Sequence, residues 1–161
     1  MSQIKNKTIL NLILIFSVFA ILAAYFIQYV LGHQPCNLCL IERVHYIFSI
    51  IIISICLFAK KYEKIVLITL SLIFLTLALL SFYHFGIEEG LIKESLVCDL
   101  NGPNNDLSKE ALLNQLKEMP ISCKDVTFKI FGLSLATFNI FISIILSAIT
   151  MKKFINYEKN K

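Results

Sequence analysis

The feature of this sequence that most constrains its fold is a long stretch without charge near its start. Residues 8–32 contain no acidic or basic side chain. A helix of about 20 apolar residues crosses the hydrocarbon core of a bilayer, so this segment is long enough to span a membrane. The run is too long for the apolar region of a signal peptide and lacks a clear cleavage pattern, so we expect it to be retained.

Three further apolar runs, about residues 38–59, 65–85 and 127–151, are also long enough to span. The sequence therefore predicts an all-α membrane protein, a four-transmembrane-helix bundle that forms a single domain over residues 1–161. Hydrophobic residues make up 57% of the chain and charged residues 16%, whereas soluble proteins average about 25% charged. This composition excludes a soluble globular enzyme, a disordered chain and a nucleic-acid-binding protein.

The positions of the lysines predict the orientation of the bundle. They cluster before the first span, between the second and third spans, and after the fourth: Lys5, Lys7, Lys60, Lys61, Lys64, Lys152, Lys153, Lys159 and Lys161. Basic residues accumulate on the cytoplasmic side, so both termini are expected there. The long loop 86–126 has four lysines against eight acidic residues. We expect it, and the short connection at residues 33–35, on the outer side.

The outer loop carries one helical pattern. Apolar residues recur at helical spacing between residues 107 and 119, and Pro120 stops the pattern. This helix could pack on the rest of the loop or lie on the outer membrane surface as a short interfacial helix. We favour the second arrangement, because four spans offer little else for the helix to pack against.

Four of the five cysteines fall on the expected outer side. Cys36 and Cys39 form a Cys-x-x-Cys pair at the mouth of the second span, and Cys98 and Cys123 flank the helical pattern of the loop. Disulfides persist in oxidising compartments, but four cysteines allow three pairings and the spacing does not choose among them. Cys56 lies deep in the second span, where we interpret it as a small core residue.

The Cys36 and Cys39 pair could be a structural disulfide, half of a zinc site or a redox centre. The pair opens a helix, whose N-terminal dipole favours thiolate, and so short a ring stabilises little. Arg43, the only arginine in the chain, is expected on the same helix face. Its planar fork suits a flat ligand, although it could instead be an interfacial arginine paired with Glu42.

The three histidines lie at the ends of the predicted spans, at the same outer depth as Cys36. His33 ends the first span, His45 begins the second and His84 ends the third. Each could be an ordinary interfacial residue. His84 is the best candidate for function, because it lies in the aromatic segment 82–86, which suits a flat molecule with a polar head.

Together, these features indicate thiol–disulfide exchange between the two cysteine pairs, which moves two electrons through a mixed disulfide. The loop pair can exchange with a soluble protein and then with the membrane pair, which must pass its electrons to an acceptor in the bilayer. The sequence has no recognisable haem, flavin or iron–sulfur motif. A lipid-soluble quinone is the simplest acceptor.

The segment Gln-Pro-Cys-Asn-Leu-Cys-Leu-Ile-Glu-Arg at residues 34–43 resembles the signature of the bacterial DsbB family. Residues 83–88 and 131–136 resemble the same family, in the same order. The resemblance implies a membrane enzyme of the bacterial inner membrane with two periplasmic loops. Such an enzyme reoxidises a DsbA-like periplasmic protein of thioredoxin fold and reduces ubiquinone or menaquinone.

The resemblance also implies roles for individual residues. Cys98 would form the mixed disulfide with the partner, and Cys123 would be its resolving mate. Cys36 would exchange with Cys123, and Cys39 would face the quinone.

Arg43, His84 and Glu42 match family positions near the quinone. Asn37 between the first two cysteines departs from the pattern and could shift the redox poise of the pair. Residues 99–122 match nothing in the family pattern, which leaves the identity of the partner open.

Three alternatives remain at this level. A vitamin K epoxide reductase-like protein also has two cysteine pairs, but there the loop pair precedes the Cys-x-x-Cys. A haem- or metal-binding membrane protein could use the histidines and cysteines, yet no two histidines have the spacing of a metal pair on one helix, so no metal ligands are predicted. A structural protein with a disulfide-stapled loop is the third.

Overall fold

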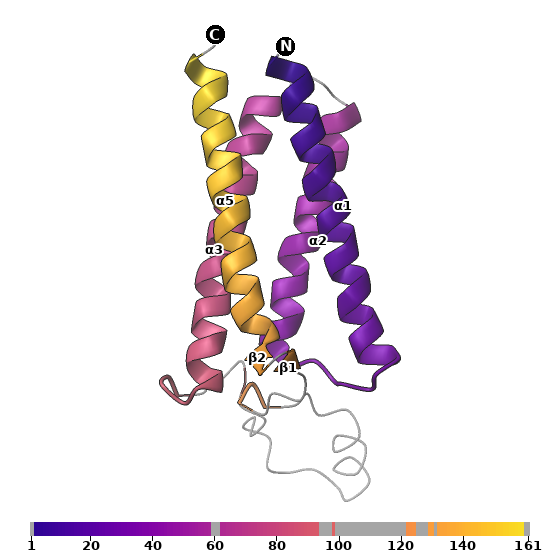
Figure 1. Cartoon of the computed structure of the whole chain (residues 1–161), viewed down its shortest axis with the longest axis vertical. Coiled ribbons are helices and arrows are strands. Elements are labelled where there is room, and N and C mark those ends of the chain that lie inside the picture. Colours follow the sequence, from indigo (N-terminus) through magenta and orange to yellow (C-terminus); the bar gives the residue numbers. More distant parts are fainter. Residues whose placement is uncertain are drawn as a thin grey trace, which may run out of the picture.

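The computed structural model describes residues 2–58, 62–93, 98, 122–124, 129–130 and 132–159. These residues form four long helices and two short strands, in the order α1 (Ser2–Tyr29), α2 (Asn37–Phe58), α3 (Glu63–Glu88), β1 (Lys129–Ile130), β2 (Leu133–Ser134) and α5 (Leu135–Lys159). The helices run along the long axis of the molecule, with both termini at one end and the strands at the other (Figure 1).

The predicted all-α architecture with four spans agrees with these helices. Within the described ranges, four helices are long and apolar enough to cross a membrane. The first three begin and end within a few residues of their predicted limits, apart from the start of α1, which extends back to Ser2. The predicted interfacial helix at 107–119 lies outside the described residues.

The start of the last helix differs from the prediction. The segment expected to begin this helix at residue 127 instead includes an antiparallel ribbon, in which Lys129 pairs with Ser134 and Ile130 with Leu133. Gly132, in the connection between the strands, has φ +82°, a conformation that glycine adopts without steric cost and that interrupts a helix. The helix therefore begins at Leu135, immediately after the ribbon.

The main core lies between the helices, towards the end that holds the termini. Its buried members come from α1, α2 and α3: Leu10, Ile13, Tyr46, Ile53, Cys56, Val66, Leu67, Leu70, Phe74 and Leu77. Cys56 is thus a core residue, as predicted. Large apolar side chains such as Phe58, Leu79 and Phe82 are exposed on the outside of the bundle, where the lipid-facing surface of a membrane protein is apolar.

Helices α3 and α5 pack closely through small hydroxyl residues. Ser71 Oγ donates a hydrogen bond to the Ser147 carbonyl at 3.3 Å, and Ser147 Oγ donates to the Ser71 carbonyl at 3.0 Å. Small residues let helix backbones approach in a membrane, and their hydroxyls link the helices. This contact fixes α5 against α3, and it thereby places the first turns of α5 beside the last turns of α3.

The end of α3 is closed by the chain folding back on it. The amides of Leu91 and Ile92 both donate to the Gly86 carbonyl, at 2.9 and 3.0 Å. A Cβ at Gly86 would lie 2.6 Å from the Ile92 Cδ1 atom. The glycine in the segment 83–88 therefore leaves room for the chain that leads into the outer loop.

Candidate functional site

Cys36 immediately precedes the first residue of α2. Its carbonyl accepts the amide of Leu40 at 3.2 Å, and its Sγ accepts the amide of Cys39 at 3.3 Å. A side chain that accepts from the third amide of a helix is in the position of an N-cap. The Cys-x-x-Cys spacing therefore places the first sulfur over the free amides and the positive end of the helix dipole, as the sequence predicted.

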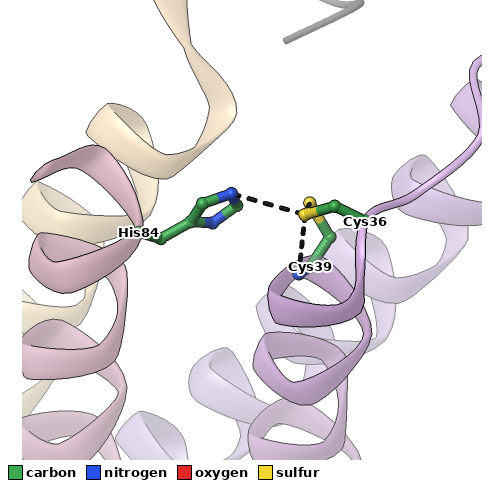
Figure 2. A group of neighbouring side chains, drawn as sticks. All are labelled: Cys36, Cys39 and His84. Atoms are coloured by element: carbon green, nitrogen blue, oxygen red, sulfur yellow. Dashed lines mark hydrogen bonds between the residues drawn. The ribbon is translucent and has the colours of Figure 1, made fainter. Parts of the chain in front are cut away.

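The two cysteines of this pair and His84 form one cluster. The sulfurs of Cys36 and Cys39 lie 2.9 Å apart, and His84 Nε2 lies 3.4 Å from the Cys36 sulfur. Figure 2 shows the imidazole reaching from α3 towards the start of α2. Cys36 and His84 are buried, and Cys36 and Cys39 are both free thiols. The structure thus brings the predicted His84 directly to the Cys36 and Cys39 pair.

These contacts favour the thiolate form of Cys36. Hydrogen bonding to Cys39 and to His84 lowers the pKa of the Cys36 thiol to about 5, although burial acts in the opposite direction. A thiolate is the nucleophile in disulfide exchange. The surroundings of Cys36 therefore favour its thiolate when the pair is reduced.

A buried polar network lies behind the imidazole. Glu42 Oε1 lies 3.2 Å from His84 Nδ1, so the carboxylate orients the ring with Nε2 towards the sulfur. Asn139 of α5 donates its amide to Glu42 Oε2 at 3.0 Å and to Ser81 Oγ at 2.8 Å, and its carbonyl accepts from the Tyr46 hydroxyl. The network joins α2, α3 and α5, and it fixes the orientation of the histidine.

Glu88 lies one turn beyond His84 on the same face of α3. Its Oε1 is 3.5 Å from His84 Nε2. Its Oε2 is buried and has no hydrogen-bond partner among the described residues. A buried carboxylate oxygen without a partner is costly, and it is therefore a feature that calls for a functional explanation.

The loop cysteines form a disulfide and join the same end of the bundle. Cys98 and Cys123 are bonded to each other, which selects one of the three pairings that the sequence left open. Both are buried in a cluster that also contains Cys36 and Ile87. The two cysteine pairs, which are far apart in the sequence, therefore meet in one place.

A cavity of about 390 Å³ opens beside the cysteines. Its walls are mainly apolar and come from α1 and α5, including Phe19, Ala23 and Phe138. Its polar end contains Cys39, Arg43 and His84. Cavities of roughly 300–1,000 Å³ with apolar walls and a few polar groups are typical of small-molecule sites.

Arg43 lines this cavity but is held by α1. Its Nη1 donates to Gln28 Oε1, and its guanidinium lies 5.4 Å from the centre of the Tyr25 ring. The sequence predicted a cation beside the two thiols. Among the described residues, the basic group in contact with Cys36 is instead the imidazole of His84, because the rotation of α2 directs Arg43 towards the first helix.

The other two histidines are not part of the thiol cluster. His45 Nδ1 lies 3.0 Å from the Ile41 carbonyl of its own helix, and His33 lines the cavity. The sequence pattern did not single out Asn139, Tyr46, Ser81 or Glu88 as members of this site. The signal for Asn139 was available, since a side-chain amide within an apolar span marks a functional position or an interhelical contact.

The chain resembles known proteins over most of its length. The family model "Disulfide bond formation protein DsbB" matches residues 6–152, which is most of the chain. The chain belongs to the DsbB family. A curated protein of Rickettsia prowazekii (strain Madrid E), "Uncharacterized protein RP370", is 32% identical over 142 residues, covering 86% of this chain and 82% of its own length. No solved structure matches the chain.

Membership of the DsbB family implies disulfide-generating oxidoreductase activity and a multi-pass membrane protein. It also agrees with the order of the cysteine pairs, in which the Cys-x-x-Cys comes first. That order argues against the vitamin K epoxide reductase-like alternative. All four cysteines that the resemblance singled out lie at the end of this DsbB protein remote from the termini.

Proposed function

We propose that this protein reoxidises a DsbA-like periplasmic protein of thioredoxin fold and passes the electrons to a membrane quinone. The observation that carries the proposal is the meeting of the two cysteine pairs. The Cys98–Cys123 disulfide and Cys36 share one buried cluster, and Cys39 borders the adjacent cavity. A relay that starts at the loop pair can therefore end beside the apolar cavity.

The first exchange takes place at the loop disulfide. A partner thiolate attacks the Cys98 sulfur and displaces Cys123 as a thiolate, and the second partner thiol then closes the partner's own disulfide and frees Cys98. Two electrons move from the partner to the loop pair. The partner leaves oxidised.

The second exchange passes these electrons to the helix pair. Cys123 attacks the Cys36 sulfur of a Cys36–Cys39 disulfide and displaces Cys39; Cys98 then attacks Cys123, which re-forms the loop disulfide and releases Cys36. The thiol pattern of the structure, with Cys98–Cys123 bonded and Cys36 and Cys39 free, corresponds to the stage after this exchange. The lowered pKa of Cys36 makes it a good leaving group.

The cavity fits a quinone in size and character. Its apolar walls suit a lipid-soluble molecule, and Cys39, Arg43 and His84 lie at the polar end, where a ring carbonyl needs hydrogen-bond donors. A quinone held there would take two electrons from the reduced pair and two protons, one from the Cys39 thiol and one from water, and would leave as the quinol. The Cys36–Cys39 disulfide re-forms in the same step, which completes the balance. Glu42 would act on this step by holding His84 in place.

The positions of the basic residues and of the cysteine pairs also support an orientation of the protein in the membrane. Basic residues such as Lys7, Lys64 and Lys152 lie towards the end that holds both termini, and the four cysteines of the two pairs lie at the opposite end. Basic residues mark the cytoplasmic side, so we place the termini in the cytoplasm and the cysteines on the periplasmic side of the inner membrane.

The test is quinone reduction by the purified protein, with a reduced thioredoxin-fold partner as the only electron source. Ubiquinone and menaquinone analogues are each followed optically for the native chain and for Cys39→Ser, Cys98→Ser and Cys56→Ser. We expect turnover in the native chain and in Cys56→Ser, because Cys56 lies in the core away from the relay. We expect none in the other two. Folded native protein that reduces neither quinone type would refute the proposal.

A further inference from the structure

We infer that the reduced Cys36 and Cys39 pair, together with His84, forms a binding site for Zn²⁺ at the start of α2. The two sulfurs and His84 Nε2 all lie within 4.8 Å of one another. Cysteine thiolates and histidine are the ligands that zinc prefers in proteins. No metal ligands were predicted from the sequence, because no two histidines have the spacing of a metal pair on one helix. The ligands here come from two helices instead.

The histidine is already oriented as a metal ligand. Glu42 Oε1 lies 3.2 Å from His84 Nδ1, which holds the ring so that Nε2 faces the sulfurs. Asn139 in turn holds the second oxygen of Glu42 at 3.0 Å. A carboxylate on the far nitrogen is the usual support of a zinc-bound histidine, because it fixes the ring and raises its basicity. The imidazole therefore needs no rearrangement to bind a metal.

A candidate fourth ligand, Glu88, lies on α3, the helix that carries His84. Glu88 Oε1 lies 3.5 Å from His84 Nε2, and Glu88 Oε2 is buried without a partner among the described residues. A bound cation would give this oxygen the partner that it lacks. The complete set, Cys36, Cys39, His84 and Glu88, combines a Cys-x-x-Cys with a His and a Glu four residues apart. Cys36, Cys39 and His84 form the close group, and Glu88, in contact with His84, would complete a tetrahedral zinc site by moving towards the metal or by binding through a water molecule.

Binding depends on the redox state of the pair and involves no electron transfer. Zinc takes the place of the protons on any thiols that are still protonated and of any proton on His84 Nε2; these protons leave to the solvent and no atom changes oxidation state. The Cys36–Cys39 disulfide offers no thiolate and cannot form the site. A bound zinc would occupy the sulfurs that must otherwise re-form the disulfide. Zinc would therefore block turnover, and this last consequence alone rests on the proposed function.

Cobalt(II) is the spectroscopic probe for the site. The protein in detergent is reduced with a phosphine, freed of the reductant without oxygen, and titrated with Co²⁺ and then Zn²⁺. We expect one Co²⁺ per chain, with the visible bands of a tetrahedral site and a near-ultraviolet sulfur-to-cobalt band, all abolished by one equivalent of Zn²⁺. The oxidised protein should show none of these bands.

Variants assign the ligands. Cys39→Ser and His84→Ala should lose the tight site, Glu42→Gln should weaken it by about 10- to 100-fold through the supporting contact, and Cys56→Ser should keep it unchanged. Because a variant can fail to fold, alkylation of the native reduced protein with iodoacetamide is the second measurement, and it should also remove the bands.

Two results would overturn the inference: no sulfur-to-cobalt band in the folded reduced protein, or the same band in the oxidised protein. The titration needs neither quinone nor partner, so its outcome is separate from that of the turnover assay. A protein that binds cobalt but never reduces quinone would refute the proposed function and leave the metal site standing. A protein that turns over but shows no sulfur-to-cobalt band would refute the metal site and leave the proposed function standing.

Discussion

The side-chain amide of Asn139 donates a hydrogen bond to the carboxylate of Glu42, across 3.0 Å in the buried part of the bundle. The same amide donates to Ser81, and its carbonyl accepts from Tyr46. A residue of the last helix therefore supports the carboxylate that orients His84, although neither Asn139 nor its helix contributes an atom to the thiol cluster. This contact makes the geometry of the cysteine site dependent on the packing of α5.

Asn139→Leu tests this support. The substitution leaves Glu42, Ser81 and Tyr46 each short of a buried partner, and an unsatisfied buried group costs about 1–3 kcal/mol. We expect a lower thermal midpoint and slower alkylation of Cys36. Asn11→Leu is the matched control, because Asn11 is exposed on the outside of α1, and it should change neither quantity. Equal effects of the two substitutions would contradict a specific role for Asn139.

The reactivity of Cys36 should show the influence of His84 on its ionisation. With the pKa lowered to about 5, the thiol is ionised at neutral pH, and its alkylation slows only as the pH falls through that value. His84→Gln removes the imidazole, so the midpoint of the alkylation profile should rise towards the ordinary range for cysteine, about 8.5.

The profile is measured by mass spectrometry of the modified Cys36 peptide after reduction and removal of metal. His45→Gln is the control, because the contact of His45 Nδ1 is with its own helix backbone. An unchanged midpoint in His84→Gln would show that the helix start and Cys39 alone control the thiol.

Arg43→Lys should affect the quinone and not the partner. The guanidinium donates a hydrogen bond to Gln28 and at the same time lies over the Tyr25 ring. The compact ammonium of a lysine lacks the planar group that makes both contacts at once. On the proposed function, we expect a KM for the quinone raised by about 10-fold, the equivalent of about 1.4 kcal/mol. The rate at which the partner reduces the Cys98–Cys123 disulfide should not change. A lower rate of that first exchange, with an unchanged quinone KM, would place Arg43 in another role.

The approach of the two cysteine pairs can be tested by cross-linking. In a Cys39→Ser, Cys98→Ser double variant, Cys36 and Cys123 should form a disulfide on mild oxidation, because they share one buried cluster and border the same cavity. Peptide mapping without reduction identifies the bond. Cys56, which lies in the separate main core, should remain free and serves as the internal control. A bond from Cys56 to Cys123 in place of Cys36 would contradict the arrangement.

The sequence alone was sufficient to predict four long apolar helices. A long uncharged apolar run must satisfy its own backbone groups in lipid, and this requirement leaves few structures besides a helix. It also singled out Cys36, Cys39 and His84, which the structure brings together at the ends of two helices, while their roles stay predictions. The prediction of helix at residues 129–130 and 133–134 was wrong, because apolar composition does not separate a short strand pair from the first turns of a helix.

The tertiary structure decided which of these residues meet. Sequence spacing places Arg43 on the face of Cys36, but the packing of α2 directs it to Gln28 and brings His84 to the sulfur from another helix. The Cys98–Cys123 pairing and the contact of Asn139 with Glu42 likewise depend on tertiary packing. Periodicity along one helix fixes which residues share a face, whereas the rotation and register between helices depend on contacts distant in the sequence.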